Sequence, residues 1–453
     1  MSGELPLPDK EQPVRNLALL SALVAGAAAA IVALPSMGHA AAAYYVAPTG
    51  SDSAAGTVSA PFRTIAKAQT VAAAGDTVYL RGGTYAYTTA TTGCAAATSV
   101  VDAITLNKSG TAGSPISYVN YPGEKPIFTF SGMTGVNCRI KGFDVTGSHL
   151  HLRGIEISGV RQNNSLNHES WGVWISGSHN TFEKLNTHHN MGPGLFIAKG
   201  GDNLVLNSDS HDNYDPYSSN GAGENGDGFG AHIAAGYTGN IFRGCRSWWN
   251  SDDGFDLIRA YASVTIENSW AWRNGYLPQT TTPAGNGAGF KAGGYGGVYV
   301  SNAAKHTVRN SVAFLNRGPG FYSNHHPVAN DYVNNTAYSN GIGYNMLGIN
   351  ASGAAVGLGT LKNNIAYGGT PTANLSGTSA ATNSSWNLNV TMSDAQFQSV
   401  STTGWNVSRQ SDGSLPALTS LHLATTSTLI DRGTDVGLPY HGTAPDLGAF
   451  ETD

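Results

Sequence analysis

The sequence is poor in charge. Asp, Glu, Lys and Arg make up 12% of its 453 residues, about half of the ~25% that is usual for soluble domains. A helical protein would carry more Glu and Lys, and a disordered one would contain less than the 40% of hydrophobic residues found here. The net charge is −5, which argues against nucleic acid as a partner. An acidic polymer would therefore need a local basic patch or a bound cation.

Cysteine is scarce as well. The chain has three, Cys94, Cys138 and Cys245, so one of them stays unpaired within a monomer. A Cys94–Cys138 bridge is compatible with the sequence, which by itself does not establish the pairing. No spacing of Cys and His resembles a zinc site.

Long apolar runs are confined to the N-terminus. Residues 17–35 are apolar, they follow Lys10 and Arg15, and small residues occupy 37–43. This pattern predicts a signal peptide in residues 1–43 with cleavage within 40–43; an uncleaved anchor is the alternative. The mature chain, 44–453, is then expected to be a monomer that is secreted, either extracellular or periplasmic if the organism is Gram-negative, with no further membrane contact.

Glycine is abundant, with 58 residues, and part of it is periodic. A Gly followed by an apolar residue recurs with a minimum spacing of 22, at Gly172, Gly194, Gly228, Gly254, Gly289, Gly320 and Gly343. A second, strand-like piece follows each of the first six copies and ends in Asn, at 190, 213, 250, 274, 316 and 340. Short strands and turns in a unit of this size predict an all-β, right-handed parallel β-helix of about ten coils.

The ends of the predicted β-helix differ from its middle. Residues 62–74 predict a short amphipathic helix within an N-terminal cap, about 60–80, that would cover the open edge of the first coil. The C-terminal part, about 370–453, is rich in Ser, Thr and Asn and predicts loops or a packing arm. Residues 44–453 are thus expected to form a single β-helix domain.

Stacking the repeat brings carboxylates together, because equivalent positions of neighbouring coils lie ~4.8 Å apart. Asp227 and Asp253 each precede a repeat glycine, and two further carboxylates flank the second copy. The predicted cluster is Asp227, Asp252, Asp253 and Asp256. Oxygen ligands at this density suit Ca²⁺ better than Mg²⁺. The alternatives are a solvated acidic turn and a purely structural Ca²⁺ site.

Lys291 is the one charged residue within 286–297 and falls in the column of Asp256 on the next coil. A lone salt bridge or a solvated lysine is the plain interpretation. A divalent cation nearby would instead lower the pKa of Lys291, and a neutral amine is a general base. Weaker substrate-binding candidates share one column: Lys199, Arg259 and His325. Surface charge is the alternative for Lys199 and Arg259, and a corner turn for His325.

The segments NGDGFG (225–230), NSDDGFDL (250–257), GAGFKAGG (287–294) and APDLGAFE (444–451) resemble the family 9 polysaccharide lyases, typified by pectate lyases. The resemblance spans most of the mature chain. It implies a ten-coil parallel β-helix, one catalytic Ca²⁺ held by the four aspartates of the cluster, and Lys291 as the base. No departure from the family pattern occurs at these five positions.

The resemblance implies a Ca²⁺-dependent pectate lyase that cleaves α-1,4-galacturonan by β-elimination to 4,5-unsaturated products, with polygalacturonate, pectin or a related uronate polysaccharide as partner. Three alternatives remain open. They are a lyase on another uronate polymer, an inverting hydrolase of the polygalacturonase type, and a Ca²⁺-stabilised carbohydrate-binding solenoid.

Overall fold

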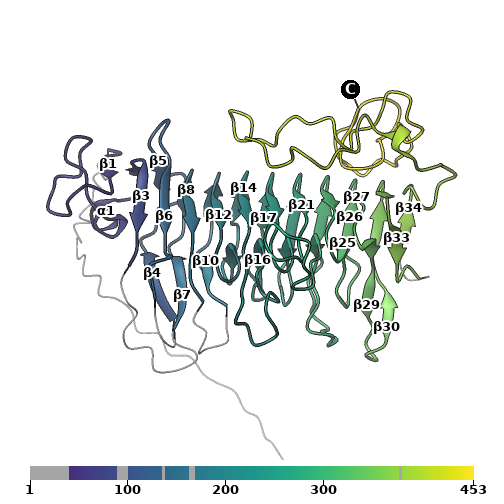
Figure 1. Ribbon diagram of the computed structural model, residues 1–453, viewed down its shortest axis with the longest axis horizontal. Helices are drawn as coiled ribbons and strands as arrows, with labels where there is room; N and C mark the ends of the chain where they lie inside the picture. The colour runs from purple at the N-terminus through teal and green to yellow at the C-terminus, as the bar shows by residue number, and fades with distance from the viewer. Residues whose placement is uncertain (1–39, 89–99, 135–137, 163–168, 377–379, 453) are drawn as a thin grey trace, which may run out of the picture. The chain divides into compact units, whose positions relative to one another are not determined.

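The repeat predicted from the sequence is a coil of short parallel strands, stacked into a β-helix (Figure 1). The computed structural model describes residues 40–88, 100–134, 138–162, 169–376 and 380–452. Residues 1–39 of the expected signal peptide, and Cys94, lie outside the described residues. Cys138 is disulfide-bonded, whereas Cys245 is a buried free thiol.

Three sheets run along the stack, and the first two are called the long sheet and the arm sheet below. The long sheet has twelve strands: β1 (Ala43–Val46), β2 (Thr77–Leu80), β5 (Ile116–Asn120), β8 (Leu150–Arg153), β11 (Thr181–Glu183), β14 (Leu204–Leu206), β17 (Asn240–Arg243), β20 (Val264–Glu267), β23 (Thr307–Arg309), β26 (Asp331–Val333), β31 (Thr360–Lys362) and β34 (Ala380–Thr382). The arm sheet has ten: β3 (Gly83–Ala86), β6 (Pro126–Thr129), β9 (Glu156–Ser158), β12 (Asn186–His188), β15 (Asp209–His211), β18 (Arg246–Trp248), β21 (Trp270–Trp272), β24 (Val312–Phe314), β27 (Thr336–Tyr338) and β32 (Ile365–Tyr367).

The third sheet, called the site sheet below, also has ten strands, in agreement with the expected number of coils. They are β4 (Val100–Leu106), β7 (Arg139–Val145), β10 (Trp171–Ile175), β13 (Leu195–Ile197), β16 (Phe229–Ala231), β19 (Phe255–Asp256), β22 (Phe290–Lys291), β25 (Pro319–Tyr322), β28 (Ile342–Asn345) and β33 (Thr370–Ala373). A small antiparallel pair, β29 (Leu347–Ile349) and β30 (Ala355–Gly357), projects from the stack (Figure 1).

The periodic glycines lie in one column, because the residues that follow them pair in register. Phe229 pairs with Phe255, and Phe255 with Phe290. These rings stack in the core at centroid distances of 5.0 and 4.9 Å. A Cβ on Gly254 would lie 2.6 Å from the carbonyl oxygen of Gly289, so the coils approach each other too closely there for a side chain.

The recurrent asparagines form a buried ladder that ties coil to coil. Each side-chain amide donates to the Oδ1 of the asparagine on the next coil, at 3.1, 2.8, 3.1, 2.9 and 2.9 Å from Asn190 through Asn340. The same Oδ1 atoms also accept backbone N–H groups, for example Asn274 N–H on Asn316 at 3.1 Å. Because each amide satisfies groups on neighbouring coils, the ladder fixes the register of the stack.

The N-terminal helix α1 (Ile65–Val71) is shorter than the predicted 62–74. It begins after Thr64, whose hydroxyl oxygen accepts the N–H of Lys67 at 3.0 Å and so satisfies one of the free donors of the first turn. Ile65 and Ala68 are buried in the core beside Phe62. The described part of the chain contains no helix with the length and apolar character needed to cross a bilayer.

The C-terminal arm begins later than about 370, because β33 and β34 continue the stack as far as Thr382. Residues beyond β34 run back along the arm sheet (Figure 1). Trp405 of the arm packs edge-on against Trp270, with ring centroids 4.5 Å apart, and Trp248 and Trp272 stack beside it at 4.8 Å. These tryptophans are therefore core residues rather than sugar-binding platforms.

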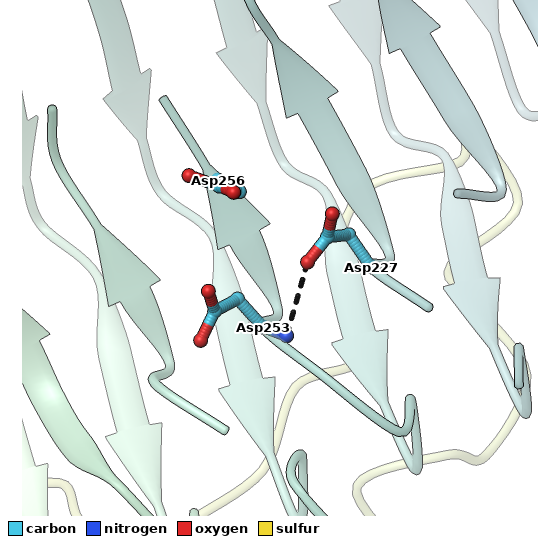
Figure 2. Close-up of side chains that lie close together, drawn as sticks. All are labelled: Asp227, Asp253 and Asp256. Carbon is cyan, nitrogen blue, oxygen red and sulfur yellow. Dashed lines mark hydrogen bonds between the residues drawn. The ribbon is translucent and has the colours of Figure 1, made fainter. Parts of the chain in front are cut away.

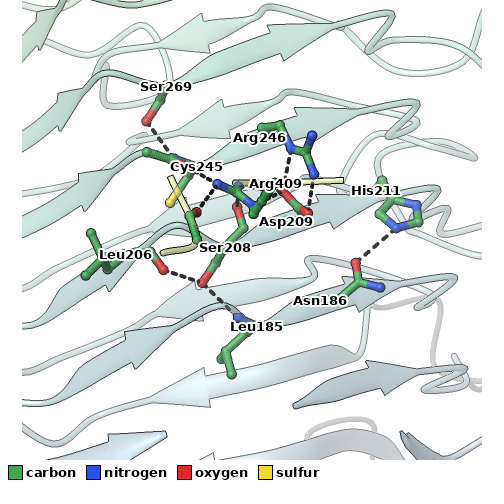
Figure 3. A network of polar contacts seen from close by, with 12 residues as sticks. Leu185, Asn186, Leu206, Ser208, Asp209, His211, Cys245, Arg246, Ser269 and Arg409 are labelled. Carbon is green, nitrogen blue, oxygen red and sulfur yellow. Dashed lines mark hydrogen bonds and ion pairs between the residues drawn. The ribbon is translucent and has the colours of Figure 1, made fainter. Parts of the chain in front are cut away.

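An ion-pair cluster fastens the arm to the coils (Figure 3). Arg409 of the arm and Arg246 of β18 both bind Asp209, at 2.6 and 2.7 Å. Arg246 also donates to the carbonyl oxygens of Trp405 and Val407. Burial works to raise the pKa of Asp209, but the two guanidinium groups outweigh it and hold the pKa below its usual value.

Two histidines are buried in the coils that follow the site. His306 accepts the N–H of Val264 at its Nδ1, and its Nε2 has no hydrogen-bond partner. His326 accepts the N–H of Gly294 at Nδ1 and donates from Nε2 to the carbonyl oxygen of Ala304 at 2.8 Å. Burial lowers the pKa of His306 to about 3 and that of His326 to about 4. Both rings are therefore neutral in the folded protein at neutral pH.

We expect Asn316→Ala to lower the free energy of unfolding by about 2–4 kcal/mol, because it removes the oxygen that accepts the backbone and side-chain N–H groups of the buried Asn274. Asn107→Ala, at an exposed position, is the control and should change stability by less than about 0.5 kcal/mol. Chemical denaturation monitored by circular dichroism measures both. Equal effects for the two variants would contradict a stabilising role of the ladder.

The two buried histidines should make the protein less stable in mild acid. Because their pKa values are lower in the folded than in the unfolded chain, their contribution is complete above about pH 6.5 and is lost as the pH falls toward 4. We expect His306→Asn to reduce the loss of unfolding free energy between pH 7.5 and 5.5 by about 1 kcal/mol. Denaturation series at the two pH values test this; an unchanged difference between them would show that His306 is not involved.

Candidate active site

Successive side chains on a strand of the site sheet point alternately into and out of the coil, and two charged residues point outward. Phe255 and Phe290 point into the core, so their neighbours Asp256 and Lys291 point outward from β19 and β22. Asp256 and Lys291 pair directly in register. The column predicted from the sequence is therefore present. The preceding position in it, Gly230, carries no side chain, and a Cβ there would lie 2.6 Å from the ring of Phe196.

Asp227 and Asp253 occupy the turns that lead into β16 and β19, one residue before the repeat glycine on adjacent coils. The Oδ1 of Asp227 accepts the backbone N–H of Asp253 at 3.1 Å (Figure 2). Carboxylate oxygens of Asp227, Asp253 and Asp256 lie within 4.8 Å of one another, and all three residues are buried. Three of the four predicted metal-ligating aspartates thus converge on one point.

The carboxylate of Asp252 faces the backbone of a neighbouring loop. Its Oδ1 accepts the backbone N–H of Asn286 at 2.7 Å, so this carboxylate holds the loop between β21 and β22. Asp253 is bound to the same loop, because its Oδ1 accepts the N–H of Ala288 at 2.6 Å. Asp252 is therefore a neighbour of the three-carboxylate cluster that is engaged by loop backbone in this structure.

Lys291 is the positive partner of the cluster. Its Nζ lies 2.9 Å from the Oδ2 of Asp253 and 3.2 Å from the Oδ2 of Asp256, and only 8% of the residue is exposed. Burial works to lower the pKa of Lys291, but the surrounding carboxylates outweigh it and raise the pKa well above its usual value. Without a further cation, Lys291 is thus held as an ammonium group.

The carboxylates of the cluster repel one another. Burial, together with repulsion from neighbouring carboxylates, raises the pKa of Asp227 and of Asp252 well above the usual range. Burial also raises the pKa of Asp253, in spite of Lys291. Asp256 differs: burial is outweighed by Lys291 and His232, and its pKa is lowered. One lysine therefore does not compensate the negative charge of the cluster.

The cluster fits a divalent cation. The Oδ2 of Asp253 is buried, and among the described residues its partner is the ammonium group of Lys291 at 2.9 Å. The donors offered by Asp227, Asp253 and Asp256 are all hard carboxylate oxygens, the ligand type that Ca²⁺ prefers. A cation here would offset the repulsion between the three residues, which Lys291 compensates only in part.

A cavity of about 300 Å³ opens over the cluster. Asp227, Asp256 and Lys291 form part of its wall, and Arg259 lies at its edge. Lys199 and His325 do not line it: Lys199 is exposed beside the ring of Tyr237, and His325 lies at a corner with φ 57°. Of the three weaker substrate-binding candidates, only Arg259 is thus brought to the cavity.

Several lining residues were not predicted from the sequence. His232 stands with its Nε2 3.6 Å from Asp256, and its ring meets Phe196 edge-on at 4.6 Å. His232 lies four residues after Gly228, so indexing every residue against the repeat would have placed it beside the cluster. Glu224 and Asn286 come from loops between coils, where the repeat gives no such guide.

Comparisons with known proteins identify the family of the chain. Residues 44–364 match the family described as "Pel9A-like, right handed beta helix region". Pectate lyase L of Dickeya chrysanthemi is 40% identical over 356 residues, which cover 77% of each chain. The crystal structure of pectate lyase Pel9A superposes with a TM-score of 0.76 at 35% identity, over 91% of this chain and 96% of that one.

A second solved structure, named rhamnogalacturonan lyase, superposes with a TM-score of 0.80 at 37% identity, over 84% of this chain and 96% of that one. The fold expected from the sequence, including its right-handed sense, is thereby confirmed, and so is the resemblance to polysaccharide lyases. With its β-helix, its buried aspartates and its paired lysine, the chain belongs to the Pel9A-like family of pectate lyases.

Proposed function

We propose that this protein is an exported, Ca²⁺-dependent lyase that cleaves α-1,4-linked polygalacturonate by β-elimination. The observation that carries the proposal is the position of Lys291 between Asp253 and Asp256, at the wall of a cavity that also presents Arg259. The residues that would hold Ca²⁺ are Asp227, Asp253 and Asp256, with Asp252 beside them. The signal-peptide pattern in residues 1–43 supports export.

Lys291 acts as the general base in this proposal. Its Nζ takes the C5 proton of a galacturonate unit; the C5 electron pair forms the C4–C5 double bond, and the C4–O4 bond breaks with its electrons on O4, which takes a proton from water. Arg259 holds a substrate carboxylate at the edge of the cavity. A Ca²⁺ bound by the aspartates would stabilise the negative charge that develops on the reacting carboxylate. The products are one fragment with a new reducing end and one fragment with a 4,5-unsaturated unit at its non-reducing end.

Lys291 must lose its proton before it can act. The carboxylates that raise its pKa would be engaged by the cation, so they would no longer retain the proton on the amine. Activity should accordingly rise toward alkaline pH and require the metal.

The geometry disfavours an inverting hydrolase. Such an enzyme places two carboxyl groups about 6.5–9.5 Å apart, with a water between them and the sugar. Here oxygens of three carboxylates lie within 4.8 Å of one another, and two of these residues are paired with Lys291. A binding solenoid would have no need for a buried lysine at this position.

A lyase on another uronate polymer is the second candidate. The structural likeness to a protein named rhamnogalacturonan lyase favours it, because that superposition has a TM-score of 0.80. The base and the metal ligands would be the same, and the polymers would be distinguished by residues elsewhere in the cavity.

Removing the base should abolish elimination. We expect Lys291→Ala to lower kcat on polygalacturonate by about 10²–10⁴-fold, which is the contribution of a general base. We also expect chelation of Ca²⁺ to abolish the activity of the wild type. The ultraviolet absorbance of the unsaturated product, with and without Ca²⁺, measures both. Reducing ends released without that absorbance would indicate a hydrolase, and full activity in chelator would refute the metal requirement.

Removing one ligand should weaken the metal site independently of catalysis. We expect Asp227→Asn to raise the dissociation constant for Ca²⁺ by about tenfold or more, because affinity depends on the number of charged ligands. Calorimetric titration of the protein, without substrate, measures it. Asp331→Asn removes the same charge from the long sheet, where Asp331 pairs with Lys305, and should leave Ca²⁺ binding unchanged; equal losses in both variants would argue against the cluster as the site.

A further inference from the structure

The cavity wall carries more acidic than basic side chains, although the proposed substrate is a polyanion. The wall contains two glutamates, Glu169 and Glu224, in addition to the aspartates of the cluster, and Arg259 is the one cation besides Lys291 and the titratable His232 among the lining residues. We propose that Glu224 is a specificity-determining residue, which excludes a free carboxylate from its side of the cavity and selects an uncharged sugar unit there. The inference rests on the proposed lyase function and deepens it.

The two glutamates differ in their partners. Glu169 forms an ion pair with Arg139, whose guanidinium lies over the ring of Trp171 at 4.0 Å, so its charge is compensated. Among the described residues, the partner of the Glu224 carboxylate is a neutral amide, Asn286 Nδ2, at 2.7 Å from Oε2, and no ion pair reaches it. Glu224 therefore presents an uncompensated negative charge to the cavity.

Glu224 is held in place by the loop that carries it. Asp215, which is fully buried, accepts the N–H and the side-chain amide of the neighbouring Asn225 at 3.0 and 3.2 Å. On the other side, a Cβ on Gly285 would lie 2.3 Å from the carbonyl oxygen of Gly223, so the two loops are in direct backbone contact. The backbone on both sides of Glu224 is therefore held in place.

The partner of Glu224 is anchored as well. The backbone N–H of Asn286 donates a hydrogen bond to the Oδ1 of Asp252, which fixes the position of this residue. The contact between Glu224 and Asn286 thus joins the loop before β16 to the loop before β22 across the cavity wall. This gives the carboxylate a defined position relative to the aspartate cluster.

A substrate carboxylate placed against Glu224 would meet a like charge, and such juxtapositions are unfavourable and serve to reject wrong partners. Arg259 attracts a carboxylate at its own place on the wall. The sugar on the Glu224 side should therefore be uncharged. Two sources supply such a unit: a uronate whose carboxyl is methyl-esterified, or a neutral sugar that alternates with uronates along the polymer.

The test compares kcat/KM, in the presence of Ca²⁺, on three polymers: unesterified polygalacturonate, the same polymer partly methyl-esterified, and a polymer in which neutral sugars alternate with uronates. Glu224→Gln removes the charge and keeps a carbonyl oxygen for Asn286, whereas Glu224→Asp keeps the charge. Asp412→Asn on the exposed arm is the control for net charge.

We expect wild type to favour one of the polymers with uncharged units, and the polymer it favours identifies the source. Glu224→Gln should shift the preference toward unesterified polygalacturonate by about 3- to 10-fold, the size of a partly screened repulsion between two charges. Glu224→Asp and Asp412→Asn should retain the wild-type preference. Added NaCl should narrow the gap between wild type and Glu224→Gln, because the Debye length falls from about 10 Å at 0.1 M to about 3 Å at 1 M.

Equal preference in wild type and Glu224→Gln at low salt would overturn the inference while leaving the lyase function intact. A gap that does not respond to salt, or the same shift in Glu224→Asp, would also overturn it, because either result indicates a structural role. Absence of unsaturated product from all three polymers would instead refute the proposed function itself.

Discussion

Every functional feature of this protein depends on the register in which its coils are stacked. The buried asparagine ladder from Asn190 to Asn340 sets that register, because each amide bonds both the side chain and the backbone of its neighbours. The stacked rings of Phe229, Phe255 and Phe290 follow the same register inside the core. A slip of one residue would unpair the ladder and turn the inward side chains outward, so the register is strongly specified.

This rigid register is what allows like charges to be held together. Asp227, Asp253 and Asp256 would separate in a flexible chain, but here their backbones are fixed by pairing on adjacent coils. The cost appears as raised pKa values of Asp227 and Asp253. Lys291 offsets part of it. The remaining imbalance is the physical reason for proposing a metal site at these carboxylates, and Lys291 lies directly beside them.

The loops between coils add what the repeat does not contain. The loop before β16 carries Glu224, the loop before β22 carries Asn286, and both reach the cavity wall. The proposed catalytic residues thus lie in the regular framework, whereas the proposed selectivity residue lies in an irregular insertion. Such a division would let one framework serve related polymers.

The sequence by itself determined the β-helix, the glycine and asparagine columns, and the juxtaposition of Asp253, Asp256 and Lys291. In a solenoid, residues at the same phase of the repeat become spatial neighbours, so these contacts can be counted along the chain. Only the tertiary structure decided that Asp252 faces the backbone of Asn286 and that Lys199 and His325 lie away from the cavity. It also decided that Glu224 is bound by a neutral amide, whereas Glu169 is bound by an arginine. These features arise where loops of different coils meet, and no periodicity in the sequence encodes the distance between them.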